Sequence, residues 1–322
     1  MMTMTTDTSR SDGVHLMLAT DGSAGAALAL DTLLDLPLGP ADRVTVVMHP
    51  TFFLAARPNG DGIVSRLAAR QRERARAIVK ATLARLIERG IRADGVVQDG
   101  EDAVDAIVRA ATDRKADLVV VGSRGHGAVA SLVIGSTART LAILCPVPIL
   151  IVRATGKALL RVLLAYDGSP AARAALALLR RLPLPREATV VALNVIPPRA
   201  WPEIGPGDDD NDVLDLRVRV EREDLTSAEN VLREAALPFG GSAVMPVVDV
   251  GPVAETILER SRRLSADLIV IGSRGATGPR RPFWGSTAER VIVSAACPVL
   301  VVPEPIRLAT EKPNVREGRM TP

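Results

Sequence analysis

The sequence predicts an α/β protein of two doubly wound domains, each a five-stranded parallel sheet with helices on both faces. Three observations support this. Sequence motifs in the chain of 322 residues recur after about 150 residues, so each copy has the size of a domain. Apolar runs alternate with helical patterns in both copies. Several runs, such as 118–121, are apolar at every position, which is typical of parallel strands buried on both faces.

The two copies are marked by motifs that recur at a nearly constant distance. The pairs are Asp21-Gly22-Ser23 with Asp167-Gly168-Ser169, 116–125 with 266–275, Gly-Ser-Thr-Ala at 135–138 and 285–288, and Cys-Pro-Val at 145–147 and 297–299. The polar Ala-Thr-Gly-Lys stretch between two apolar runs separates the copies. We therefore expect domains at 1–155 and 156–322.

In the first copy, strands and helices alternate along the chain. The first helix should end before Pro37, because proline cannot continue a helix. The second is long and rich in Ala and Arg. The expected strands are 14–20, 43–49, 95–98, 118–121 and 147–152, and the expected helices are 24–36, 64–89, 102–114 and 136–144.

The second copy repeats this order, with expected strands at 162–166, 189–195, 243–248, 268–271 and 299–302. Two segments look unlike packed structure. The stretch 202–212 contains an acidic run and is typical of a solvated loop. The stretch 303–322 is polar and interrupted by prolines, as in a loose tail.

Composition excludes several classes of protein. Hydrophobic residues make up 47% and charged residues 24%, which is typical of a globular chain. Aromatic residues are only 2%, too few for a platform that stacks single-stranded nucleic acid. Basic and acidic residues nearly balance at 40 and 37, and Arg66, Arg70 and Arg74 fit a solvated helix face. Nucleic acid is therefore not an expected partner.

The expected compartment is the cytoplasm. Cys145 and Cys297 are too few for a disulfide framework or a cysteine-rich zinc site, and we interpret them as buried structural thiols. The polar residues 1–12 do not resemble a signal peptide. The longest apolar stretch, 141–152, has twelve residues and contains two prolines, so we expect no membrane partner.

The residues most suited to chemistry follow the expected fourth strand. Gly122 and Gly125 are followed, after nine residues, by Gly135-Ser136-Thr137, and the second copy has the same spacing. A glycine loop that leaves a parallel strand can bring backbone N–H groups close to an anion, and glycine also permits positive φ. The N–H groups at the next helix start would add to this. The alternative is a packing glycine with a Ser/Thr helix cap.

A second feature is the aspartate that ends the first strand of each copy. Ligands in open α/β sheets bind beyond the carboxyl ends of the strands, where the winding reverses. Asp21 and Asp167 could accept hydrogen bonds from ribose hydroxyls or an adenine amino group. They could equally cap the following helix, because Asp-Gly-Ser is also turn chemistry.

Together these motifs resemble the universal stress protein family over nearly the whole chain, in a tandem form. The resemblance implies a sheet of order 3-2-1-4-5 and ATP, with or without Mg²⁺, as ligand. It implies that the adenosine end contacts the strand-one aspartates and Val195, whose first-copy counterpart is Pro50. It implies that phosphates and ribose are held by the glycine motifs, which comprise Gly122, Arg124, Gly125, Gly135, Ser136 and Thr137, and Gly272, Arg274, Gly275, Gly285, Ser286 and Thr287. It also implies pairing through the last strands, within a chain or in a homodimer.

Some features depart from the pattern. Ten residues separate Gly135 from Cys145, but twelve separate Gly285 from Cys297, which predicts a last helix shorter by two residues in the first copy. The second loop carries Arg280, Arg281 and Trp284, and the arginines could reach phosphates or face water. His126 lies in the first loop, but its counterpart is Ala276, which argues against a catalytic role.

The expected function is ATP binding in a regulatory stress response, with slow or no hydrolysis and no catalytic or metal-binding residues of its own. The alternative is an interaction scaffold of the same fold that has lost its ligand. An enzyme related to the adenine-nucleotide α-hydrolases is the least favoured, because none of the four lysines lies in a motif loop.

Overall fold

The computed structural model describes residues 13–50, 62–99, 102–125, 134–153, 158–199, 210–236, 244–275 and 285–304. Each half contributes five strands. Those of the first half are β1 (His15–Ala19), β2 (Arg43–Met48), β3 (Ala93–Val97), β4 (Leu118–Gly122) and β5 (Ile149–Val152). Those of the second half are β6 (Arg161–Ala165), β7 (Thr189–Ile196), β8 (Val244–Val250), β9 (Leu268–Gly272) and β10 (Val299–Val302).

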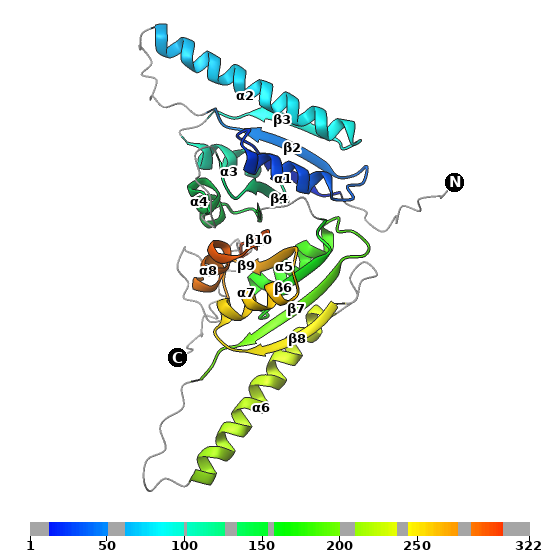
Figure 1. The fold of residues 1–322 in the computed structure, drawn as a ribbon, viewed down its shortest axis with the longest axis vertical. Helices are drawn as coiled ribbons and strands as arrows, with labels where there is room; N and C mark the ends of the chain where they lie inside the picture. Colours follow the sequence, from blue (N-terminus) through cyan, green and yellow to red (C-terminus); the bar gives the residue numbers. More distant parts are fainter. Residues whose placement is uncertain are drawn as a thin grey trace, which may run out of the picture.

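The strands join into one sheet of ten, in the order β3-β2-β1-β4-β5-β10-β9-β6-β7-β8 (Figure 1). The predicted order 3-2-1-4-5 is therefore confirmed in both halves. Every pair of neighbouring strands within a half is parallel. Among the described strands, only the pair of β5 with β10 is antiparallel. The carboxyl ends of the strands therefore lie at one edge of the sheet in the first half and at the opposite edge in the second.

Helices cover both faces of this sheet, as predicted for a doubly wound fold. They are α1 (Ala24–Leu34), α2 (Gly62–Glu88), α3 (Ala103–Asp113), α4 (Ser136–Leu144), α5 (Pro170–Arg181), α6 (Asp210–Ala235), α7 (Val253–Arg263) and α8 (Ser286–Ser294). The cluster under α1, α2, α5 and α6 includes Leu16 and Leu18 of β1, whereas the cluster under the other four includes Met17. Successive side chains point to opposite faces, so each core layer runs through both halves.

The two halves are held together where β5 meets β10. The apolar strands pair through Leu150 and Leu300 at the centre of this seam. The last strands β5 and β10 thus pair with each other within one chain, along edges that would otherwise be free. The structure therefore shows the predicted pairing of the last strands within one chain, and the homodimer stays a prediction.

A buried arginine crosses the same seam. Arg153, directly after β5, is only 7% exposed. Its guanidinium donates to the carbonyl oxygens of Ala295 (3.0 Å), Val293 (3.3 Å) and Ile292, which are the open acceptors at the end of α8. Burial lowers the pKa of the Arg153 guanidinium, but the three carbonyls compensate the charge. The arginine therefore caps a helix of the other half.

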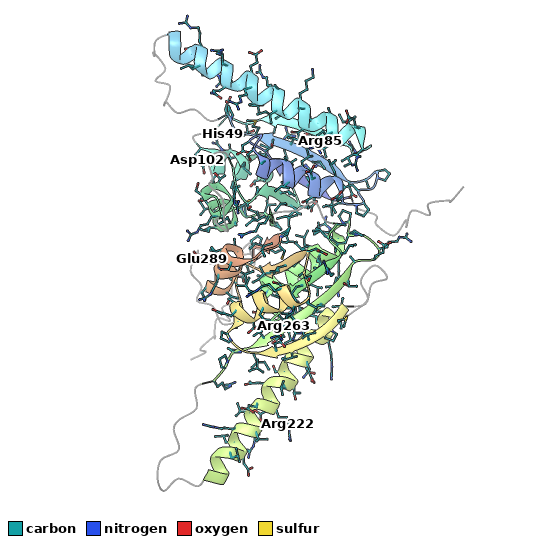
Figure 2. The ribbon with its side chains drawn as sticks, in the orientation of Figure 1. His49, Arg85, Asp102, Arg222, Arg263 and Glu289 are labelled. Carbon is teal, nitrogen blue, oxygen red and sulfur yellow. The ribbon has the colours of Figure 1, made fainter. Side chains whose placement is uncertain are left out.

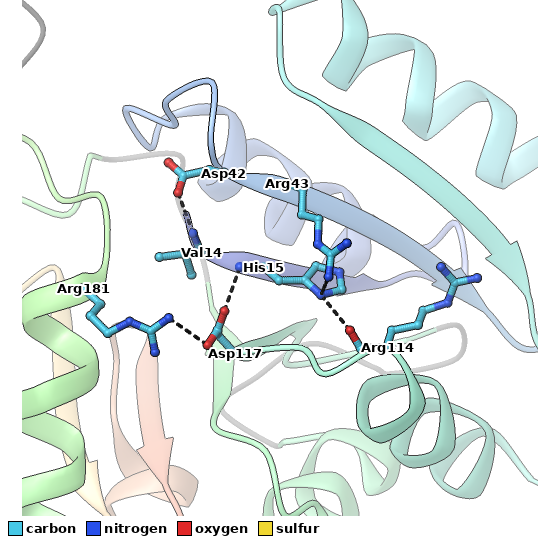
Figure 3. Close-up of polar contacts among 7 residues, drawn as sticks. All are labelled: Val14, His15, Asp42, Arg43, Arg114, Asp117 and Arg181. Carbon is cyan, nitrogen blue, oxygen red and sulfur yellow. Dashed lines mark hydrogen bonds and ion pairs between the residues drawn. The ribbon is translucent and has the colours of Figure 1, made fainter. Parts of the chain in front are cut away.

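Ion pairs also link the halves. Arg139 of α4 lies 2.6 Å from Glu289 of α8, the equivalent position 150 residues later. Arg181 of α5 lies 3.0 Å from Asp117, which precedes β4 (Figure 3). All four side chains are at least partly exposed, so each pair contributes at most about 1 kcal/mol. The apolar seam and Arg153 are the stronger connections.

Two sequence expectations are corrected. The last helices α4 and α8 have nine residues each, so the first is not shorter. The N–H of Val119 donates to Pro148 O, and that of Ile269 to Pro298 O, so these prolines are equivalent. The two Cys-Pro-Val motifs are therefore out of register by two residues. Residues 210–212, the end of the stretch 202–212 that was expected to be a loop, begin α6.

Candidate functional site

The predicted site residues gather where the winding of each half reverses. In the first half Asp21 follows β1, the neighbouring strand β4 leads into Gly125, and Gly135 begins α4. The Gly135 N–H donates to Ser123 O at 2.7 Å, which fastens the helix start to the loop after β4. In the second half Gly285 N–H donates to Ser273 O at 3.0 Å. Both halves thus bring these residues together at the position where open α/β sheets bind ligands.

The Asp-Gly-Ser turn shows which residue caps the helix. Gly22 has φ +76°, a left-handed conformation that glycine adopts without strain. The Ser23 N–H donates to Asp21 Oδ1 at 2.9 Å, and Ser23 Oγ accepts from Ala26 N–H in the first turn of α1. The serine is therefore the helix cap, and the capping alternative for the aspartate is wrong. The second half repeats these contacts through Gly168, Asp167 and Ser169.

The same serines fasten the turn to the glycine loop. Ser23 Oγ donates to Arg124 O at 3.4 Å, and Ser169 Oγ donates to Arg274 O at 3.2 Å. The aspartate lies against the next residue of that loop. A Cβ at Gly125 would stand 2.5 Å from Asp21 Oδ2, and one at Gly275 would stand 2.9 Å from Asp167 Oδ2. A side chain at either glycine would displace the carboxylate.

Close approach, not an unusual backbone angle, requires the loop glycines. Among described residues, positive φ occurs at four glycines, and none of the predicted site glycines is among them. A Cβ at Gly122 would overlap the backbone of Gly25 in α1, and one at Gly272 would lie 2.8 Å from Ala171 Cβ. The first glycine of each motif thus has the packing role. Gly25 and Ala171 were missed by sequence reasoning, and the signal for this contact is the small size of the residue at both positions.

The first turns of α4 and α8 differ from those of α1, α3 and α5, whereas α7, with Pro252 at its N-cap, also lacks a side-chain hydrogen bond there. The N-cap residues of α4 and α8 are Gly135 and Gly285, and neither helix has a side-chain hydrogen bond at its cap. In α1, α3 and α5 a serine or aspartate fills that role. Ser136, Thr137 and Ser286 are exposed and Thr287 is half-buried. N–H donors at the positive end of a helix dipole suit an anion.

The two loop arginines have different surroundings. Arg124 is half-buried, and its Nε is buried without a hydrogen-bond partner among the described residues. Arg274 Nη1 lies 3.4 Å from Glu304 Oε2. First-turn charge also differs, since Glu289 lies in the first turn of α8 and α4 has no acidic residue there. The first half therefore presents more positive charge beside the glycine loop.

The expected adenine contacts need one correction. Ala19 pairs with Val47, and the equivalent Ala165 pairs with Leu193. Two residues further along, the counterpart of Val195 is His49, and Pro50 corresponds to Ile196. Val195 and His49 are half-buried and Pro50 is buried. All of these lie at the carboxyl end of β2 or β7, beside the aspartate turn.

Part of the predicted site lies outside the described residues. His126 and the second-loop residues Arg280, Arg281 and Trp284 fall in 126–133 and 276–284. Where the chain is described, grooves run beside α6 and between α2 and β3, and neither is lined by a predicted site residue. The described segments contain no group of three or more His, Cys, Asp or Glu side chains arranged for a metal ion. No described helix is long and apolar enough to cross a membrane.

His15 lies at the opposite end of β1 from the candidate site (Figure 3). Its Nε2 is 2.9 Å from Thr45 Oγ1, and its Nδ1 is 3.1 Å from Arg114 O and 3.0 Å from Arg43 Nη2. Burial, together with the Arg43 charge, lowers the pKa of His15. The imidazole is therefore a neutral structural group of the sheet.

The two thiols are also structural. Cys145 is buried and Cys297 is half-buried, and neither forms a disulfide. Burial raises the pKa of both, that of Cys297 to about 11. A protonated, enclosed thiol is a poor nucleophile.

Comparison with known proteins identifies this arrangement. The profile of the universal stress protein family matches residues 15–153 and again 159–303. A universal stress protein of Mycolicibacterium smegmatis is 30% identical over 215 residues, 65% of this chain and 69% of that protein. One from Thermus aquaticus is 37% identical over 141 residues, 44% of this chain and 96% of that protein. The crystal structure of a universal stress protein from Archaeoglobus fulgidus has a TM-score of 0.60 at 22% identity, covering 90% of this chain and 98% of that one.

Proposed function

The chain belongs to the universal stress protein family, and we propose that each half binds one adenine nucleotide, ATP, beyond the carboxyl ends of its parallel strands. The observation that carries the proposal is the pair of helix N-termini at Gly135 and Gly285. Both lack a side-chain cap and both are fastened to a glycine loop. A polyphosphate would supply the acceptors that those N–H groups lack.

The residues divide the nucleotide between them in this proposal. The phosphates lie at the first turn of the helix, contacted by Ser136 and Thr137 in the first half and by Ser286 and Thr287 in the second. Gly125 and Gly275 allow the backbone to approach. Asp21 and Asp167 accept hydrogen bonds from the ribose or adenine, because each keeps Oδ2 at the glycine loop. His49 and Val195 lie where a base would rest.

The proposed role is regulatory, with ATP held and not rapidly turned over. The four lysines, Lys80, Lys115, Lys157 and Lys312, all lie outside the glycine motifs, so no lysine of the loops reaches a leaving phosphate. Mg²⁺, where present, accompanies the triphosphate. ATP turnover measured beside ATP binding tests this part, and rapid turnover abolished by one side-chain change would contradict it.

Calorimetric titration with ATP tests the binding proposal. We expect two sites per chain in the wild type, one in Gly125→Val, one in Gly275→Val, and none in the double variant. In both variants the new side chain meets the aspartate carboxylate. Gly39→Val is the matched control, since its nearest neighbour, Asp42 Oδ2, is 3.7 Å away. Wild-type protein without affinity below millimolar ATP overturns the proposal.

A scaffold without ligand is the second candidate. The packing role of Gly122 and Gly272 favours it, because part of the glycine motif is explained by helix contact alone. In that case titrations of the wild type with ATP or ADP give only the heat of dilution into buffer. Gly125→Val and Gly275→Val then affect stability and not binding.

A further inference from the structure

The long helices of the two halves carry opposite charge. Helix α2 has seven basic and two acidic residues, a formal charge of +5. Its counterpart α6 has eight acidic and four basic residues, a formal charge of −4. Among the described residues, Arg72 and Arg85 of α2 and Asp224 and Glu234 of α6 form ion pairs with the body. The remaining charges keep the same signs.

Both helices extend well beyond the sheet that supports them. In α2 the buried residues are Ala75, Val79, Thr82 and Leu86, all in the carboxyl-terminal half, and in α6 they are Ala228, Leu232 and Ala235. The helices lie at opposite ends of the molecule, with α2 beside β3 and α6 beside β8 (Figure 1). They therefore cannot meet within one chain, and their amino-terminal halves project side chains into the surroundings (Figure 2).

The projecting part of α6 carries an apolar stripe. Leu214, Val218 and Leu225 are 57%, 47% and 43% exposed. With Glu221 they are spaced by four, three and four residues, so they share one helix face. An open groove of about 910 Å³ runs beside this face, lined by Val218 together with Asp215, Arg219, Arg222 and Glu223 (Arg222 is labelled in Figure 2).

The projecting part of α2 offers the complementary face. Leu67 is 47% exposed, and Arg70 and Arg74 follow at spacings of three and four on the same side. Glu221 interrupts the apolar stripe of α6, so a partner that covers the stripe must bring a cation to that point. A basic helix with a leucine on the same face has this chemistry.

We propose that α2 of one copy of this chain docks against α6 of a second copy. Pairing α2 with α2, or α6 with α6, brings like charges together, and such pairs are disfavoured. Pairing α2 with α6 joins opposite charges and covers Leu67, Leu214, Val218 and Leu225. Each chain carries one basic and one acidic helix, so the association is head to tail. It does not involve the β5–β10 seam or the candidate nucleotide sites.

Charge reversal tests this association. Mass measured by light scattering at low salt should exceed that of one chain and fall to the monomer at high salt, because exposed charge pairs are screened. Arg70→Glu with Arg74→Glu, or Glu221→Arg with Glu223→Arg, should each give a monomer at low salt. All four substitutions in one chain should restore the association, at least tenfold tighter than either double variant.

The control changes the same charge elsewhere. Arg92→Glu with Arg109→Glu lies on exposed positions outside α2 and should leave the mass unchanged. Circular dichroism establishes that each variant is folded. A wild-type monomer at low salt overturns the proposal, as does association that survives reversal on either helix. Copurifying nucleic acid that depends on Arg70 and Arg74, without chain association, also overturns it and assigns the basic helix to another partner.

Discussion

The two halves of this chain share the hydrogen bonds of the loops that follow their strands. They differ in the side chains at the seam between β5 and β10. Both have an aspartate that accepts from the serine two residues later, and a serine that fastens the turn to the glycine loop. At the seam, Arg153 is matched by Pro303, and Arg139 by Glu289. The geometry of the loops depends on contacts within each half, so both halves keep the residues that make them. The residues at the seam need only fit the residues of the other half, so equivalent positions differ and complement each other.

The first glycine of each motif gives the largest test of this comparison. Gly122→Ala should lower the free energy of unfolding by about 3 kcal/mol, because the methyl group would overlap the rigid backbone of Gly25. Gly272→Ala should cost less, about 1–2 kcal/mol, since its Cβ would stand 2.8 Å from the Ala171 methyl group and 2.9 Å from the backbone of Ala171 and Ala172, farther than the 2.4 Å at Gly122.

Urea denaturation of both variants measures this difference. Gly39→Ala is the control and should change stability little, because a Cβ there meets only Asp42 Oδ2 at 3.7 Å. Equal losses at Gly122 and Gly272 would show that the halves do not differ in how tightly their first helices approach the sheet.

Arg153 tests the asymmetry of the seam. Arg153→Ala should destabilise the chain by about 2 kcal/mol, because three carbonyls at the end of α8 lose their donor. Pro303→Ala, at the equivalent position, should have a smaller effect. Hydrogen exchange should report faster opening of α8 than of α4 in the arginine variant. The same loss in both helices would contradict a one-sided cap.

His15 gives the first half a pH dependence that its counterpart Arg161 cannot give the second. Because the folded pKa lies below the unfolded value of 6.5, the unfolded chain takes up the proton first. The His15 contribution is complete above pH 6.5 and is lost as pH falls towards the folded pKa. Urea denaturation of His15→Asn should show a shallower loss than wild type in this window. An unchanged slope would show that another group titrates there.

The ion pair between Arg139 and Glu289 should have the smallest effect. Glu289→Arg places two arginines together and should cost about 0.5 kcal/mol at low salt, because both side chains are about half exposed. Adding Arg139→Glu should restore the loss. A loss that persists in the swapped pair would mean that these residues act through their own helices and not through each other.

The sequence predicted most element positions because apolar runs and glycine spacing are local signals, whereas the strand order came from the resemblance to a known family. Contacts with backbone atoms were not predictable. The partners of Arg153 are carbonyls, which every residue has, so only the structure identifies them. The motif Cys-Pro-Val misled for a related reason. The motif occurs in both halves, but at positions that are not equivalent in the structure. The hydrogen bonds from Val119 and Ile269 show that Pro148 is the counterpart of Pro298. The same bonds also explain why α4 and α8 have equal length.

Among the described strands, one antiparallel pair separates the two candidate sites. Because β5 and β10 run in opposite directions, anything held beyond one set of strands is a full strand length from anything held beyond the other. That distance exceeds the range of about 8 Å over which exposed charges act on each other at physiological salt. Two polyanionic ligands could thus bind to one chain without repelling each other. The electrostatic part of the binding free energy at either site would not depend on whether the other site is occupied.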